Sequence, residues 1–259
     1  MNLDLKGKTA LVCGSTAGIG KAIAIELAEL GANIILMARN EAKLQSTIKE
    51  LSKAENQKHL YAVADFSDIT SVKKAVESIS QNINILINNT GGPPGGPIVD
   101  AETSEFVTAF SMHLLCNHTL VQGIKDGMIE SGYGRIINII STSVKQPLNG
   151  LGVSNTVRGA VANWSKTMAN ELGVHGITVN NVLPGATATE RLSSIVANKA
   201  VKTGKEEDEV MKAMENQVPM KRVAEPEEIA AAVAFLASPA ASYINGINVP
   251  VDGGRTGCL

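Results

Sequence analysis

The sequence predicts an α/β fold: a doubly wound parallel sheet of about seven strands, flanked by helices. Short β-branched runs alternate with longer amphipathic stretches along the chain. The first apolar run leads directly into closely spaced glycines and then into a helical pattern. The 259 residues, 44% of them hydrophobic, are enough to build one core without disulfides or metals. We therefore expect residues 1–259 to form a single domain.

The expected elements follow from these runs. Strands are expected near residues 8–13, 33–38, 59–64, 83–88, 134–140, 177–183 and 246–250. Helices are expected near residues 19–30, 41–54, 69–81, 103–130, 152–172 and 226–237. Parallel strands are favoured, because each intervening helix returns the chain to the same end of the sheet.

Two further segments bear on ligand binding. The glycine- and proline-rich loop 91–97 follows the fourth expected strand, at the edge where open α/β sheets form ligand crevices. Residues 190–217 are polar, contain helical patterns and include the charge run 205–209. Two interpretations of this segment remain open: a mobile substrate lid over the crevice, or plain solvated helices.

Composition and charge argue against several classes of partner. The chain has 23 Lys and Arg and 25 Asp and Glu, a net charge of -2, so no nucleic-acid surface is expected. No apolar run reaches membrane-spanning length, so no membrane partner is expected. The scattered Cys13, Cys116 and Cys258 fit a reducing, cytoplasmic location. The four histidines lack metal-ligand spacing, so no metal site is expected.

A glycine motif follows the first expected strand. Residues 13–20 read Cys-Gly-Ser-Thr-Ala-Gly-Ile-Gly, with the spacing G-x-x-x-G-x-G. Glycine permits a tight turn and lets the backbone approach a pyrophosphate, which then lies at the positive end of the helix. We expect a Rossmann-fold dinucleotide site, with Gly14 at the turn and Gly20 where the helix packs against the strand.

The end of the second expected strand bears on the choice of cofactor. A site that prefers NAD places an acidic residue roughly 20 positions after the turn, to hold the ribose 2′-hydroxyl. Ala38 stands there instead, followed by Arg39 and Asn40. No carboxylate would repel a 2′-phosphate, and the planar guanidinium of Arg39 suits one. An exposed arginine is often merely solvated, but the two observations together favour NADP.

Across essentially its full length the chain resembles the short-chain dehydrogenase/reductase family, in the style of the 3-oxoacyl-carrier-protein reductases. The matching motifs are residues 13–20, 65–66, 88–91, 184–189 and 245–254, in family order. Cys13 stands where the family usually has threonine. The resemblance implies a small-molecule carbonyl or alcohol substrate and a homotetramer.

The resemblance also assigns cofactor contacts. Asp65 would accept a hydrogen bond from the adenine amino group. Asn89 would border the adenine-side ribose or would only satisfy neighbouring backbone groups. Thr189 would bond the nicotinamide carboxamide or cap a helix. The full expected set is Gly14, Ser15, Thr16, Gly18, Ile19, Gly20, Arg39, Asn40, Asp65, Phe66, Asn89, Pro184, Gly185, Thr187 and Thr189.

The chain departs from the family at the proton-transfer residues. Family members carry a serine after the fifth strand, then a tyrosine in the next helix and a lysine four residues later. Ser141 matches the serine, but Ser154 and Arg158 stand at the other two positions. The tyrosines, Tyr61, Tyr133 and Tyr243, all lie outside the stretch between Ser141 and the sixth expected strand. His113 replaces the asparagine of the family tetrad.

These replacements need not end hydride transfer. General acid catalysis is worth about 10²–10⁴-fold, and orienting two reactants can be worth more. Arg158 cannot shuttle a proton, but it can hold ribose hydroxyls or an anionic substrate group. The proton could come from water, from His113 or from Lys145, although a solvated Lys145 is the better interpretation.

Two hypotheses follow. The first is an NADP-dependent oxidoreductase in which Ser141 and Ser154 donate hydrogen bonds to the carbonyl oxygen and Arg158 fixes ribose or stabilises charge. The second is a catalytically inactive NADP-binding protein with a sensing or assembly role. The hydroxyl and the cation kept at positions 154 and 158 favour the enzyme.

Overall fold

The computed structural model describes residues 1–53 and 56–258 of the chain. Its strands form one parallel sheet in the order β3-β2-β1-β4-β5-β6-β7. They are β1 Thr9–Cys13, β2 Asn33–Ala38, β3 Leu60–Val63, β4 Ile85–Asn88, β5 Gly134–Ile139, β6 Ile177–Pro184 and β7 Asn248–Val251. The predicted doubly wound parallel sheet is therefore confirmed.

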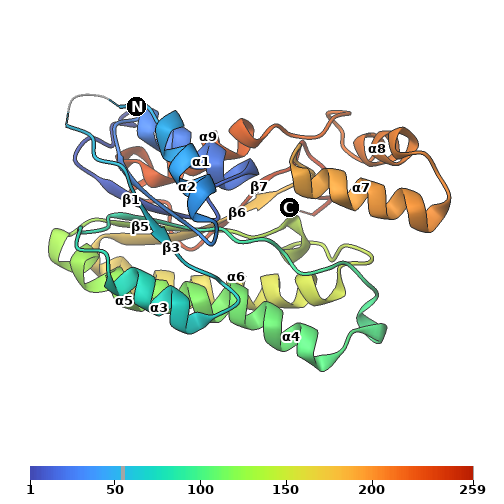
Figure 1. The fold of residues 1–259 in the computed structure, drawn as a ribbon, viewed down its shortest axis with the longest axis horizontal. Helices are drawn as coiled ribbons and strands as arrows, with labels where there is room; N and C mark the ends of the chain where they lie inside the picture. The colour runs from blue at the N-terminus through green and yellow to red at the C-terminus, as the bar shows by residue number, and fades with distance from the viewer. Residues whose placement is uncertain (54–55, 259) are drawn as a thin grey trace.

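Helices cover both faces of this sheet. They are α1 Gly18–Glu29, α2 Glu41–Thr47, α3 Ile69–Glu77, α4 Thr103–Phe110, α5 Cys116–Ser131, α6 Gly152–Leu172, α7 Glu190–Thr203, α8 Glu207–Asn216 and α9 Pro226–Ala237. Figure 1 shows α1, α2 and α9 on one face and α3, α4, α5 and α6 on the other, with α7 and α8 together at one end.

Three predicted helices differ from the observed ones, and the one predicted over 69–81 ends at Glu77. The helix predicted over 41–54 is shorter, because α2 ends at Thr47 and a 3-10 turn, Ile48–Glu50, follows. The last residue of that prediction, 54, lies outside the described residues. The helix predicted over 103–130 contains a π-helical segment, Ser111–Leu115, between α4 and α5. A π turn adds one residue to the helical repeat, often at a functional site.

Burial of both sheet faces explains why the strands are almost continuously apolar. Neighbouring residues of a strand point to opposite faces, so Val12 packs into the core beneath α1 and α9, while Leu11 packs into the core beneath α3 and α5. Both side chains are fully buried. Packing on both faces therefore fixes the ends of the strands, and this positions the loops that follow them.

A row of asparagine side chains crosses the sheet from β4 to β7. The amide nitrogen of Asn88 donates to Asn138 Oδ1 (2.8 Å), and that of Asn138 donates to Asn181 Oδ1 (2.9 Å). Asn181 donates in turn to Asn248 Oδ1 (2.8 Å). Each pair is also a Cα pair of the parallel register. A slip of one residue would separate these buried amides, so the row specifies the register.

Replacing the central amide should cost more stability than replacing the terminal one. Asn138 is fully buried, and Asn138→Ala would leave both Asn88 and Asn181 short of a partner. We expect the free energy of unfolding to fall by about 2–4 kcal/mol. Asn248→Ala, at the half-buried end of the row, should cost only about 1 kcal/mol. Urea denaturation measures both values, and equal losses would contradict a register-setting role.

Candidate functional site

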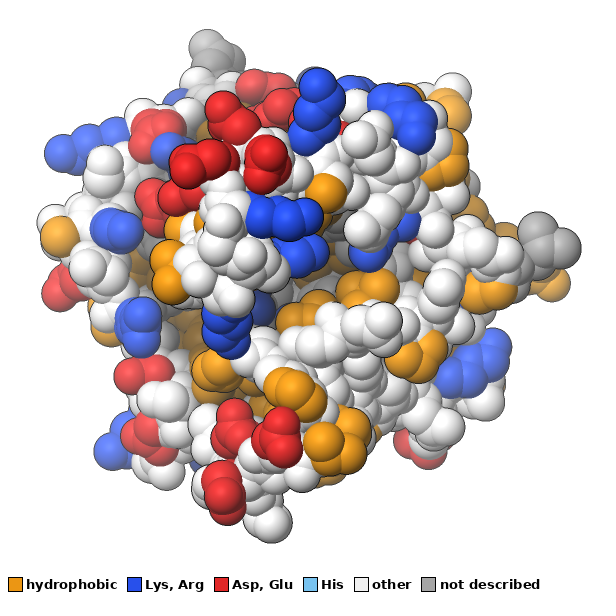
Figure 2. All heavy atoms as spheres, turned by 90° about the vertical axis from the view of Figure 1, so that its right-hand side faces the viewer, with side chains coloured by type: hydrophobic (Ala, Val, Ile, Leu, Met, Phe, Trp, Pro, Cys, Tyr) orange, Lys and Arg blue, Asp and Glu red, His pale blue; other side chains and the backbone are white. Residues whose placement is uncertain are grey.

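The candidate site lies at the carboxyl ends of the strands, where the sheet order reverses between β1 and β4. Four connections meet there: residues 14–17 after β1, 89–97 after β4, 140–151 after β5 and 185–189 after β6. Figure 2 views the molecule from the end at which α7 and α8 lie, and shows Lys and Arg side chains gathered around a central hollow. Cationic side chains therefore border this hollow.

The glycine turn brings α1 into close contact with the end of β1. Gly14 has a φ of +58°, in the left-handed region that favours glycine. A Cβ at Gly20 would lie 2.2 Å from the carbonyl oxygen of Gly14, so a side chain cannot fit between turn and helix. Ala17, which cannot cap with its methyl group, precedes α1, and Gly-Ile-Gly-Lys forms the first turn. The N–H groups of that turn are available to an anion.

Two polar side chains border the glycine turn. The Ser15 hydroxyl is fully buried and has no hydrogen-bond partner among the described residues. Such a group is rare in a folded protein and is available to a ligand. Asn89 Nδ2 donates to the carbonyl oxygens of Cys13 and Gly14, both at 3.3 Å. Asn89 thus satisfies neighbouring backbone, as one of the two interpretations predicts, and its ribose contact stays a prediction.

At the other end of the crevice lie the residues expected at the adenosine. Arg39 is exposed, and its guanidinium forms no hydrogen bond or ion pair within the described part of the chain. Asp65 Oδ1 accepts hydrogen bonds from Ser67 N (2.9 Å) and Ser67 Oγ (2.7 Å). These bonds lower the pKa of Asp65, with a smaller contribution from the charge of Arg39. Asn40 caps α2 by accepting from Lys43 N (3.0 Å), a role that the sequence analysis missed.

The connection 185–189 packs against Asp252 and Gly18, and it leads directly into α7. Gly185 lies against Asp252, where a Cβ would be 2.8 Å from the Asp252 Cα. Thr189 caps α7 by accepting from Leu192 N (3.3 Å), so its helix-capping interpretation is observed. A Cβ at Gly18 would lie 2.9 Å from Thr189 Cγ2. The start of α1 and the connection after β6 are therefore in close contact.

The remaining members of the expected cofactor set lie along the same segments. Thr16 is half-buried within the glycine turn, and Ile19 packs onto the core beneath α1. Phe66 is buried, and its carbonyl oxygen accepts a hydrogen bond from Cys116 Sγ at 3.3 Å. Pro184 ends β6. These positions are compatible with the predicted contacts, which stay predictions.

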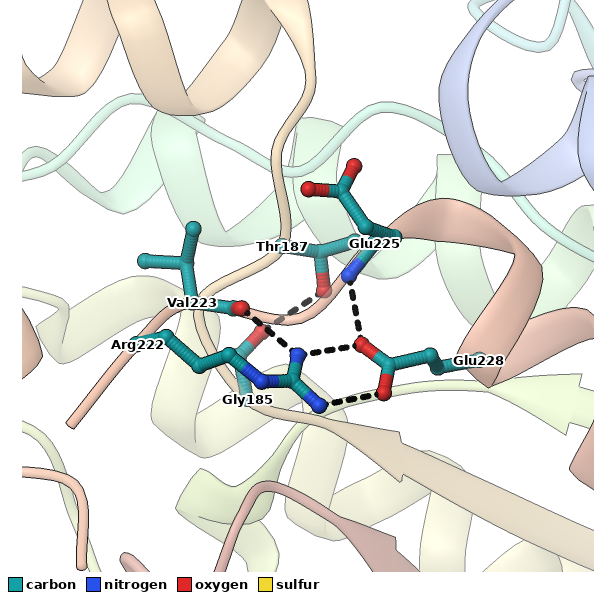
Figure 3. A network of polar contacts seen from close by, with 6 residues as sticks. All are labelled: Gly185, Thr187, Arg222, Val223, Glu225 and Glu228. Atoms are coloured by element: carbon teal, nitrogen blue, oxygen red, sulfur yellow. Dashed lines mark hydrogen bonds and ion pairs between the residues drawn. The ribbon is translucent and has the colours of Figure 1, made fainter. Parts of the chain in front are cut away.

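A polar network fastens the far end of the α7–α8 segment (Figure 3). Arg222 and Glu228 form a bidentate pair with two contacts of 2.6 Å, and Glu228 also accepts from Glu225 N (2.8 Å). The hydrogen bonds from Arg222 lower the pKa of Glu228 to about 2. Ala224 pairs with the strand-like stretch around Thr187. The segment is thus held at both ends beside the crevice.

Between those ends, 190–217 consists of two helices with their own small core. Leu192, Val196 and Ala200 of α7 pack against Val210 of α8. This cluster is separate from the two cores that flank the sheet. A helical pair that is fastened at its ends and packed on itself could move as one unit, and the lid interpretation stays a prediction.

The three residues expected at the proton-transfer positions come from the connection after β5 and from α6. Ser141 caps a 3-10 turn, Thr142–Val144, by accepting from Ser143 N (3.1 Å). Ser154 is half-buried on α6, and its hydroxyl forms no hydrogen bond with the described residues. Arg158 follows one turn later, is 8% exposed, and donates through Nη1 to the carbonyl oxygen of Ile139 (2.9 Å). This bond places the Arg158 guanidinium beside the end of β5.

Tight packing fixes the start of α6 and hence the placement of Ser154 and Arg158. A Cβ at Gly152 would lie 2.6 Å from Ile98 Cα, so the helix abuts the chain that follows the 91–97 loop. On its other side, Asn155 donates to the carbonyl oxygen of Leu148 (2.9 Å) and accepts from Leu148 N (3.4 Å). The first turn of α6 therefore packs between the chain that follows the 91–97 loop and the connection 140–151.

The charges that shift the pKa values of His113 and Arg158 are positive. Burial, and to a smaller extent the charge of Arg191, lower the pKa of Arg158 to about 10. Burial, Arg158 and Arg191 together lower the pKa of His113 to about 3, so its imidazole is neutral at pH 7. His113 Nδ1 lies 2.7 Å from Thr90 Oγ1, and Nε2 is buried without a partner among residues 1–53 and 56–258.

Two of these neighbours, Thr90 and Arg191, were not predicted as site residues. Arg191 Nη1 donates to the carbonyl oxygen of Gly92 (2.9 Å), and Nη2 donates to that of Pro93 (3.2 Å). Its place two residues after Thr189, in the first turn of α7, was the available signal. Thr90 lies within the quoted motif 88–91, so its contact with His113 could have been sought there.

Two other classes of site, a membrane-spanning helix and a metal centre, are absent from the described residues. Within residues 1–53 and 56–258, no helix is both long enough and apolar enough to cross a membrane. The same residues contain no group of three or more His, Cys, Asp or Glu side chains placed to hold a metal ion.

Comparison with known proteins gives consistent matches. Residues 14–256 match the family model described as enoyl-(acyl carrier protein) reductase. The 3-oxoacyl-[acyl-carrier-protein] reductase FabG of Vibrio cholerae is 35% identical over 97% of this chain and 98% of its own. The NADPH-dependent reductase BacG of Bacillus subtilis is 31% identical over 95% and 97%. L-sorbose reductase from Gluconobacter frateurii, solved with NADPH and L-sorbose, superposes with a TM-score of 0.93 at 30% identity, covering both chains completely.

The buried, neutral His113 predicts a defined sensitivity to acid. Its folded-state pKa of about 3 lies below the ordinary value of about 6.5. Between these values the unfolded chain takes up a proton that the folded protein does not. Stability is therefore lost as pH falls through this window, with a slope of up to about 1.4 kcal/mol per pH unit.

His113→Asn should remove that part of the slope, which urea denaturation at a series of pH values between 4 and 7 would show. The matched control is His175→Asn, because His175 is exposed and its removal should leave the slope in place. An unchanged slope in His113→Asn would contradict the assignment of a buried, neutral imidazole.

Proposed function

This chain belongs to the short-chain dehydrogenase/reductase family, and on that premise we propose that it is an NADP-dependent oxidoreductase acting on a carbonyl/alcohol pair. The proposal includes an atypical proton-transfer site made of Ser141, Ser154 and Arg158. The observation that carries it is the anchoring of Arg158 to the carbonyl oxygen of Ile139, two residues before Ser141. That bond holds the cation of α6 at the end of β5, close in sequence to the hydroxyl of Ser141 in the connection that follows.

The residues of the crevice fit the proposed cofactor. The open N-terminus of α1 and the unpartnered hydroxyl of Ser15 supply donors for a pyrophosphate. Arg39 lies unpaired at the end of β2, where a 2′-phosphate would be bound. Relatives described as NADPH-dependent or solved with NADPH support the same choice. NADPH would supply the hydride when bound.

The chain's own residues would orient and polarise the substrate. Ser154 and Ser141 are both half-buried, and each hydroxyl can donate to a carbonyl oxygen. The positive charge of Arg158 would stabilise negative charge that develops on that oxygen. Of the five N–H groups of this guanidinium, one is bonded to Ile139, and others are available to a ribose hydroxyl or to substrate.

Water is the proposed source of the proton. Arg158, whose pKa is about 10, stays protonated throughout the transfer at neutral pH. His113, with a pKa of about 3, holds no extra proton at pH 7 and cannot serve as an acid there. A serine hydroxyl is too weakly acidic to give up its proton, but it can relay one. Lys145 remains the second candidate that the sequence offers.

The assembly and the lid belong to the same proposal. Family resemblance supports a homotetramer, and the helical pair of 190–217 is proposed to close over the substrate. The separate core of α7 and α8 and the network around Arg222 support closure as a unit. A single NADP-binding domain over residues 1–259 is proposed as well, since one sheet supplies every connection to the crevice.

Arg39 should determine cofactor preference. We expect Arg39→Ala to weaken NADPH binding by roughly 10- to 100-fold, the loss of one charge-assisted contact to a phosphate, while NADH affinity changes little. Fluorescence titration with both cofactors measures this. Lys43→Ala removes an exposed cation from the neighbouring helix and should leave both affinities unchanged. Equal affinities of the wild type for NADPH and NADH would overturn the choice of cofactor.

The proton-transfer site is tested by NADPH consumption on a broad carbonyl panel. Arg158→Ala should lower turnover strongly, by roughly 10²-fold or more, because a charge beside the reacting oxygen is lost. Ser154→Ala should lower it less, since Ser141 still donates. Ser154→Tyr combined with Arg158→Lys restores the family pair and should raise turnover on simple ketones.

Folding and NADPH affinity are checked in each variant, because Arg158 is buried and could also hold ribose. A wild type that binds NADPH tightly yet turns over no carbonyl on the panel would establish the inactive, sensing or assembly alternative. Turnover that is indifferent to Arg158 would remove the proposed site while leaving the family assignment intact.

A further inference from the structure

Two arginines from separate parts of the fold converge on the loop that follows β4. A Cβ at Gly92 would lie 2.8 Å from Arg191 Nη2 and 3.4 Å from Arg158 Nη2. Arg158 comes from α6 and Arg191 from the first turn of α7. Glycine at position 92 leaves the space that both guanidinium groups approach. Two like charges are thus brought together at one border of the crevice.

No carboxylate compensates this charge within the described residues. The ion pairs found there are Lys21–Glu50, Lys73–Glu77, Lys125–Asp126 and Arg222–Glu228, and none involves either arginine. Arg158 and Arg191 instead donate to backbone carbonyl oxygens, of Ile139 and of Gly92 and Pro93. Arg158 is buried and Arg191 is exposed. A buried cation without a counter-charge is unfavourable, and an anion bound between Arg158 and Arg191 would relieve that cost.

The adjacent histidine adds no negative charge. His113 is 2% exposed and neutral, and its Nε2 is one of the buried polar atoms left without a partner among the described residues. A second donor or acceptor is therefore available beside the arginine pair. The cluster has the composition of an oxyanion site: two planar guanidinium groups that match the oxygens of an acid, together with a neutral imidazole.

The cofactor's own phosphates are accounted for elsewhere in the crevice. The glycine turn and the N-terminus of α1 suit the pyrophosphate, and Arg39 suits the 2′-phosphate. Arg158 follows Ser154 by one helical turn, so the arginine pair lies next to the proposed reacting carbonyl instead. The proposed reaction needs one cation to polarise the carbonyl, and the arginine pair supplies two.

We infer that Arg158 and Arg191 bind an acidic group of the substrate, a carboxylate or a phosphate, so that the compound reduced is an anionic carbonyl compound. The inference rests on the proposed function for the reacting carbonyl, whereas the anion site can be tested by itself. Because the arginine pair lies close to Ser154, the acidic group and the carbonyl of the substrate bind at neighbouring places. We therefore expect a compact substrate.

Calorimetric titration of the protein saturated with NADP⁺ tests the site without turnover. Three ligands are compared. Oxamate carries a carboxylate and methylphosphonate carries a phosphonate, whereas oxamide is neutral and close in shape to oxamate. We expect oxamate or methylphosphonate to bind at least 10-fold more tightly than oxamide. The two anions distinguish a carboxylate site from a phosphate site, and binding of neither would overturn the inference.

Variants assign the binding to the arginine pair. Arg191→Met should weaken anion binding roughly 10- to 100-fold, and Arg191→Lys should have a smaller effect because the charge is kept. The matched control is Lys199→Met, which removes an exposed cation from the same helix and should have no effect. Melting temperatures show whether each variant is folded.

Two outcomes separate this inference from the proposed function. An NADP⁺ affinity that falls in step with anion affinity in Arg191→Met would mean that the pair serves the cofactor, and would overturn the inference. Brisk NADPH consumption on neutral ketones without any preference for acids would also overturn it, while upholding the oxidoreductase. Anion binding without turnover on any carbonyl would uphold the anion site and reject the proposed reaction.

Discussion

The row of amides from Asn88 to Asn248 is the constraint on which the geometry of the crevice depends. A parallel sheet covered on both faces could slide by a residue at little cost in apolar contact, because its strands are almost uniformly apolar. Buried amides remove that freedom, since each pair bonds only in the observed register. The strands β4 to β7 therefore end at fixed relative heights, and so do the loops that follow them.

A second constraint acts at β1, where backbone approaches backbone. Gly20 leaves no room for a Cβ against Gly14, and Asn89 binds the carbonyl oxygens of that turn from the end of β4. The first helix is thereby fixed to the two strands between which the sheet order reverses. Together with the amide row, this contact holds both walls of the crevice, one at the glycine turn and the other along α6.

The sequence predicted those parts of the molecule that depend on short-range patterns. Alternating apolar runs predicted the parallel sheet, and the spacing of Gly14 and Gly20 predicted the turn, because each depends on local backbone geometry. The π turn around His113 was missed, since one extra residue in a helical repeat leaves no mark on composition. The approach of Arg191 to Gly92 was also missed, because 99 residues of sequence separate the two partners.

The proposed replacement of a tyrosine–lysine pair by Ser154 and Arg158 would change the electrostatics of the crevice. A lysine lowers the pKa of a neighbouring phenol, and the phenolate that forms offsets the lysine's charge. A serine hydroxyl does not ionise in this way, so an arginine beside it keeps its full charge. Arg191 adds another charge, and the burial of Arg158 limits how far water screens the charge of that guanidinium. Such an arrangement is least costly when an anion is bound, so the proposed replacements would alter what is bound as well as how the proton is transferred. The neutral state of His113 follows first from its burial, which lowers its pKa, and then from the charges of Arg158 and Arg191, which lower that pKa further.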